Sequence, residues 1–186
     1  MTLINLFQDY NDTSKLTQIA INLWTGWGYN MFKVENQLRA DSMVIRTKGS
    51  QILGRAKTSL SDAETAYRRK MLPPLTRESP KHHPDALAGA RSIEALVTEI
   101  GRIEGQLRSA PAPETDRIML RWRNERGLLE RLVESDKITI GKAEVFRSVV
   151  EGKDGQWVVE NEAQIRAGLA SLDESIKERS DMLLTV

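Results

Sequence analysis

Apolar side chains recur at helical spacing through most of the first 72 residues. Steps of three or four residues from Leu16 to Met71 give 16 positions, and 14 of them are apolar. The mean step of about 3.67 residues is that of one continuous helical face, which we call the apolar stripe. Its two exceptions are Ser42 and Gly49. The positions are Leu16, Ile19, Leu23, Trp27, Met31, Val34, Leu38, Ser42, Ile45, Gly49, Ile52, Ala56, Leu60, Ala63, Tyr67 and Met71.

The stripe predicts a long amphipathic helical tract over residues 1–72, capped near its start by Asp12 or Thr13. Interior glycines each cost a helix about 1 kcal/mol relative to alanine, so we expect a kink at Gly26–Gly28 or a break at Gly49. Without either, the helix would be about 80 Å long, twice the roughly 40 Å width of a compact domain of this size. A protruding amphipathic helix needs a partner to cover it.

All six prolines follow this tract, between Pro73 and Pro113. We expect a proline-rich loop over 73–84 and a helical bundle over 85–186, which together with the tract form one cooperative unit. Pro84 suits the first turn of a helix that ends near Ser109. Apolar residues seven apart on this helix, Ile93, Ile100 and Leu107, resemble a short coiled coil.

The remaining bundle is predicted from shorter patterns. A tight turn at Pro111–Pro113 precedes a helix from Glu114 to about Ser135, which we expect to lie antiparallel to the previous helix. Residues 139–159 fit a helix or, with a turn at Gly152–Gly155, a small β-hairpin over 149–159. A last helix runs from about Asn161 to Leu183. The predicted fold class is therefore all-α.

Charge is balanced overall but uneven along the chain. The net charge is +1, yet residues 39–70 hold eight basic and three acidic residues, whereas residues 151–186 hold four basic and eight acidic residues. This asymmetry favours an anionic partner for the basic part. Alternatively, the acidic part packs beside the basic part within the fold.

Chemistry-bearing motifs are scarce. The chain has no cysteine, and its two histidines, His82 and His83, are adjacent in the proline-rich loop. Neither a Glu-x-x-His pair nor the sequence signature of a serine nucleophile, a phosphate loop or a dinucleotide site is present. We therefore expect no catalytic residue, metal, cofactor or small-molecule substrate, and interpret the chain as a non-enzyme.

The expected location is the cytoplasm. The first seven residues lack the positive start and long apolar core of a secretory signal. No segment approaches the about 20 apolar residues that cross a bilayer, so we expect no membrane partner.

Three aromatic residues are candidate anchors for a protein partner: Trp24, Trp27 and Phe32. Tryptophan is enriched at the energetic centres of protein interfaces. The alternative is that these side chains pack inside the protein.

Basic residues eleven apart form the second candidate site. Arg46, Lys57 and Arg68 share one helical face, and Arg39 precedes them by seven residues. Cations in a row with small residues between them can follow a phosphate backbone. We add Arg121, beside Trp122, because arginine with an aromatic ring suits nucleic acid. The alternative is a solvated helix face.

These observations lead to three hypotheses. The first is a non-catalytic helical subunit or adaptor that packs on other chains, in a homo- or hetero-oligomer. The second is a helical protein that binds nucleic acid without reading its sequence, through the basic face of residues 39–70. The third is an enzyme with an unrecognised carboxylate or arginine site.

Overall fold

The computed structural model describes residues 7–26, 35–75, 81–111 and 125–184, and most of these residues are helical. No strand occurs among them, so the all-α prediction is confirmed. The elements are η1 (Gln8–Asn11), α1 (Thr13–Gly26), α2 (Glu35–Met71), α3 (Pro84–Ser109), α4 (Glu125–Val150), α5 (Gly155–Glu160) and α6 (Glu162–Leu184).

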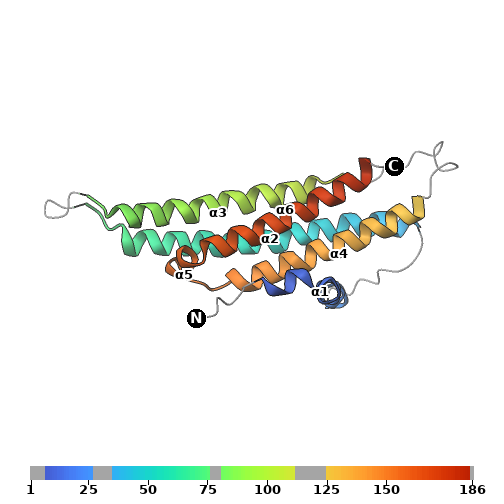
Figure 1. The fold of residues 1–186 in the computed structure, drawn as a ribbon, viewed down its shortest axis with the longest axis horizontal. Helices are drawn as coiled ribbons and strands as arrows, with labels where there is room; N and C mark the ends of the chain where they lie inside the picture. The colour runs from blue at the N-terminus through green and yellow to red at the C-terminus, as the bar shows by residue number, and fades with distance from the viewer. Residues whose placement is uncertain (1–6, 27–34, 76–80, 112–124, 185–186) are drawn as a thin grey trace.

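The four long helices lie side by side along the long axis of the molecule (Figure 1). Helix α2 packs against α3 on one side and α4 on the other, while α6 packs on α3 and α4. Consecutive long helices run in opposite directions. Helix α1 packs on α4 and is seen nearly end-on, so it crosses the bundle.

The described residues of the N-terminal tract form η1 and two α-helices. Helix α1 ends at Gly26, and α2 begins at Glu35 and continues through Gly49 without interruption. Its 37 residues correspond to about 55 Å of helix. Gly49 is a contact point, because a Cβ atom there would lie 2.8 Å from Leu107 Cδ2 and 3.2 Å from Ile140 Cγ1.

Side chains cap the starts of two helices: Asp12 at α1, as predicted, and His83 at α3, which was not predicted as a cap. Asp12 caps α1, since its Oδ1 accepts a hydrogen bond of 3.0 Å from the backbone N–H of Lys15. At α3, Pro84 occupies the first turn and His83 Nδ1 accepts a 3.4 Å hydrogen bond from the backbone N–H of Asp85. These side chains satisfy N–H groups that a helix start leaves without partners.

The ambiguous region is helical. Helix α4 continues to Val150, so the predicted helix end at Ser135 is wrong, and so is the hairpin alternative for 149–159. A turn at Gly152, with φ of 70°, leads into α5, which Asp154 caps through the N–H of Trp157 at 2.8 Å. Asp136 and Lys137, just beyond the predicted end, are buried within the continuous helix.

The apolar stripe is buried, and the chain's own helices cover it. The described stripe residues with almost no exposed surface are Leu16, Ile45, Ile52, Ala56, Leu60, Ala63 and Tyr67. The coiled-coil-like residues of α3 are also buried, as their spacing predicted. Within the described residues, only the end of the stripe at Met71 is exposed, so the stripe gives no argument for a partner.

Candidate functional site

The predicted aromatic anchors lie largely beyond what the structure describes. Trp24 belongs to the last turn of α1, but its side chain is outside the described part of the chain. Trp27 and Phe32 lie outside the described residues. Their role in binding a partner stays a prediction.

The predicted basic row does not form a free surface. Arg46 is buried, with 5% of its surface exposed, and its Nε donates to the backbone carbonyl of Ser42 at 3.1 Å. Burial lowers the pKa of Arg46, and the nearby charge of Arg179 lowers it further. Arg46 therefore does not share an exposed face with the other basic residues of the row.

The other two described cations of the row turn toward α3. Lys57 Nζ lies 3.8 Å from Glu104 Oε2. Arg68 donates to Glu64 of its own helix at 2.6 Å and to Glu94 of α3 at 2.8 Å. Lys57 and Arg68 thus join α2 to acidic residues of α3.

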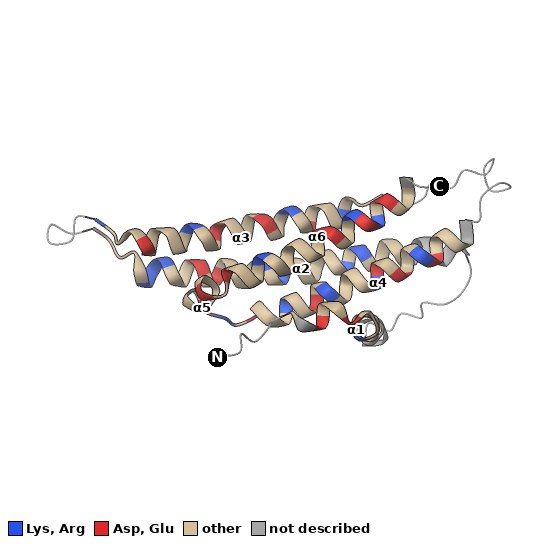
Figure 2. Ribbon diagram, viewed as in Figure 1, with Lys and Arg blue, Asp and Glu red and all other residues tan. Residues whose placement is uncertain are grey.

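The basic residues of the prediction also do not gather into one patch. Figure 2 shows positions of acidic and basic residues interspersed along the helices of the bundle. The side chain of Arg39 and the whole of Arg121 lie outside the described part of the chain, so their proposed contacts remain predictions.

A buried polar network replaces the expected basic face. Asp136 of α4 accepts hydrogen bonds from Arg179 Nε at 2.6 Å and from Ser42 Oγ at 2.8 Å. Arg179 also donates through Nη2 to Ser42 Oγ at 3.2 Å and through Nη1 to the carbonyl of Pro111 at 2.8 Å. The network therefore ties α2, α4, α6 and the end of α3 together.

The side chains at the centre of this network are buried. Arg179 has 0% and Asp136 has 1% of its surface exposed. Burial raises the pKa of Asp136, although Arg179, Ser42 and Arg46 act in the opposite direction. With no opening for a ligand, the network serves to hold helices together.

Helical spacing in the sequence already places the residues of this network at core positions. Arg179 follows Ile176 by three residues on the apolar face of α6, and Asp136 follows Val133 by three on that of α4. Ser42 is the polar exception in the apolar stripe. Polar residues at core positions on three helices are expected to meet, because each needs a buried partner.

Lys142 makes a second polar cluster, between α4 and α6. Its Nζ lies 2.6 Å from Ser175 Oγ and 3.0 Å from Ser171 Oγ, and burial lowers its pKa. A serine beside a lysine can act as a nucleophile with the lysine as its base. Such a site also requires N–H donors that stabilise the oxyanion of the intermediate. Because α6 is one continuous helix, its N–H groups near these serines are used within the helix. We therefore assign the cluster to helix packing.

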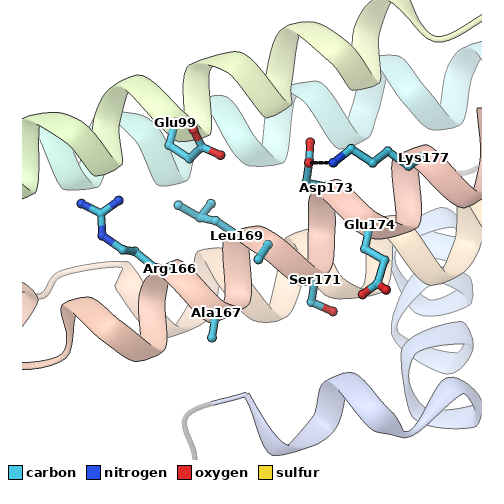
Figure 3. A pocket seen from close by; sticks show the side chains of 9 residues that line it. Glu99, Arg166, Ala167, Leu169, Ser171, Asp173, Glu174 and Lys177 are labelled. Carbon is cyan, nitrogen blue, oxygen red and sulfur yellow. Dashed lines mark ion pairs between the residues drawn. The ribbon is translucent and has the colours of Figure 1, made fainter.

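A groove of about 720 Å³ runs along α6, and we call it the α6 groove. Figure 3 shows that α6 provides most of its walls and that Glu99 reaches it from α3. The residues that line it are Glu99, Arg166, Ala167, Leu169, Ala170, Ser171, Asp173, Glu174 and Lys177.

Charges in the α6 groove are arranged in pairs. Asp173 lies 2.7 Å from Lys177 and 3.0 Å from Arg102 of α3. Burial alone would raise the pKa of Asp173, but the hydrogen bonds and charges of these two cations hold it below its usual value. Glu99 has a lowered pKa chiefly because Arg102 donates to it. Both carboxylates are therefore ionised at neutral pH.

Arg166 and Glu174 stand on the outer side of the α6 groove. Arg166 Nε donates to Glu162, one turn earlier, at 2.8 Å. Glu174 is exposed, one turn after Ala170. The groove thus presents the short side chains of Ala167 and Ala170 between Arg166 and Glu174.

Metal chemistry finds no support in the described part of the chain, where no group of three or more histidine, cysteine, aspartate or glutamate side chains could hold an ion. Among the helices described, none is long and apolar enough to span a bilayer.

Comparisons with family models, curated proteins and solved structures give no match for this chain.

Proposed function

We propose that this chain is a non-catalytic helical subunit or adaptor that packs on other chains of a larger assembly. The observation that carries the proposal is the α6 groove, an open depression that follows a helix. We propose the cytoplasm as its location, since a chain without cysteine suits a compartment where disulfides do not form.

The shape of the groove suits a chain segment. Small-molecule sites are usually concave, largely apolar and enclosed, with a few convergent polar groups. The α6 groove is instead open and bordered by ion pairs such as Asp173–Lys177. A helix can lie along such a groove with its small or apolar side chains over Ala167 and Ala170 and its charges at the rim.

Copurification from the native host, with two variants of the full chain, tests this proposal. Ala170→Trp fills the middle of the groove, whereas Ala88→Trp places the same side chain on the exposed surface of α3. We expect Ala170→Trp to lose a partner that wild type and Ala88→Trp both retain. If all three proteins recover the same partners, or none, the groove is not the site of assembly.

A nucleic-acid role is the second candidate, and it rests on cations other than the predicted row. Arg55, Arg69 and Lys70 are exposed on α2. Replacing all three with glutamine should weaken binding to single- or double-stranded oligonucleotides and flatten its salt dependence. Absence of wild-type binding at about 50 mM salt, measured by fluorescence anisotropy, would exclude this role.

A further inference from the structure

We infer that a second copy of this chain docks on the α6 groove, with the two α6 helices antiparallel and crossing at Ala170. The inference rests on the proposed function, because it names the partner of the same groove. It depends on the order of charges along α6 and on the shape of the groove.

One face of α6 points out of the bundle. At about 100° per residue, Ala163, Arg166, Ala170, Glu174 and Lys177 fall on the same side of the helix. All five are exposed, and the last four line the groove. Alanine at the centre lets a second helix approach closely, because its side chain ends at Cβ.

The charges on this face complement themselves. Arg166 precedes Ala170 by four residues, and Glu174 follows it by four. A twofold axis through Ala170 therefore places Arg166 opposite Glu174 of the second copy, and Glu174 opposite Arg166 of that copy. Such a contact is isologous, with the same patch used on both chains. A parallel arrangement would bring like charges together.

Both groups can make this contact. The ion pair with Glu162 uses Nε of Arg166, so the terminal Nη groups can reach across the interface. Glu174 is exposed on the same face, so its carboxylate is open to a guanidinium of the second copy. Its neighbour Asp173 is buried and already held by Arg102 at 3.0 Å and by Lys177 at 2.7 Å.

Sedimentation equilibrium of the full chain and four variants tests the inference. We expect wild type to form dimers, and Arg166→Glu and Glu174→Arg each to weaken dimerisation about tenfold or more, since symmetry repeats each change twice. The double variant Arg166→Glu/Glu174→Arg restores opposite charges and should recover dimerisation. Arg91→Glu, an exposed reversal on α3, should leave it unchanged.

Three outcomes would overturn the inference. The first is a wild-type protein that stays monomeric up to about 1 mM. The second is a double variant that dimerises no better than the single ones, and the third is a dimer that neither reversal weakens. Failure here leaves the proposed function standing if Ala170→Trp still loses a host partner, because that partner would then be a different chain.

Discussion

Two aspartates in this bundle, Asp136 and Asp173, each form an ion pair, yet their surroundings shift their pKa values in opposite directions. Asp136 lies 2.6 Å from Arg179, and both side chains have 0% exposed surface. Asp173 lies 2.7 Å from Lys177, whose side chain is 68% exposed. Burial raises the pKa of Asp136, whereas the cations around Asp173 lower its pKa despite partial burial.

The comparison shows that the distance between two charges says little about what the pair does. A buried pair is costly to break, because the remaining charge has lost its hydration and its partner. An exposed pair is screened by water and can exchange partners at small cost. The Asp136 network therefore suits a fixed helix arrangement, and the α6 groove suits reversible contact with another chain.

Removing Arg179 should have the largest effect. Arg179→Met leaves Asp136 buried without its cation, and we expect the free energy of unfolding to fall by about 3–5 kcal/mol in urea denaturation. The double variant Asp136→Leu/Arg179→Met removes both charges and should be more stable than the single one. A loss below about 1 kcal/mol in Arg179→Met would contradict the distinction between the two aspartates.

Adding a single methyl group should change stability in opposite directions at a closely packed glycine and at an exposed one. Gly49→Ala places Cβ 2.8 Å from Leu107 Cδ2, so we expect a loss of about 1–3 kcal/mol even though alanine favours helix. Gly105→Ala on α3 meets nothing within 4 Å and should stabilise the protein by up to about 1 kcal/mol. Equal effects in thermal unfolding would show that α2 and α3 are not closely packed at Gly49.

Lowering the pH should change the contributions of the two aspartates to stability in opposite directions. A raised native pKa means that the native state binds the proton more tightly, so the contribution of Asp136 to stability grows as the pH falls through its native pKa toward 3.8. The lowered native pKa of Asp173 means that its contribution is present above 3.8 and is lost as the pH falls through its native pKa.

Urea titrations of wild type, Asp136→Asn and Asp173→Asn between pH 7 and pH 3 check these directions. The stability of wild type relative to Asp136→Asn should increase with acid, and its stability relative to Asp173→Asn should decrease. The same direction for both variants would refute the opposite environments of the two aspartates.

Removing the exposed cation should have the smallest effect. Lys177→Ala takes away an ion pair whose lysine is mostly solvated, so we expect a loss below about 1 kcal/mol in urea denaturation. Arg102 continues to hold Asp173 at 3.0 Å. A loss as large as that of Arg179→Met would mean that Asp173 belongs to the core.

Much of the helix order was predictable, because helical spacing is a local property of the chain. The predicted boundaries of α3, between Pro84 and Ser109, agree with the structure because proline marks both ends. The end predicted at Ser135 was wrong: α4 continues to Val150, no proline lies near Ser135, and the adjacent Asp136 is buried, which requires a partner from elsewhere in the fold. Asp136 has such a partner in Arg179, 43 positions later.

The site was less predictable than the fold. Spacing placed Arg46, Lys57 and Arg68 on one face of a helix, but it could not show that α3 brings Glu104 and Glu94 to that face. Nor could it identify the α6 groove, whose shape depends on Glu99 of another helix. Both features arise from residues far apart along the chain.

By itself, the sequence determined that the chain is helical, that its apolar stripe must be covered, and that Ser42 is an exception within it. The tertiary structure decided that the chain's own helices provide the cover and that Ser42 meets Asp136 and Arg179. The physical reason is that amphipathic spacing fixes which side of a helix is buried, whereas the neighbour on that side is chosen by packing of the whole chain.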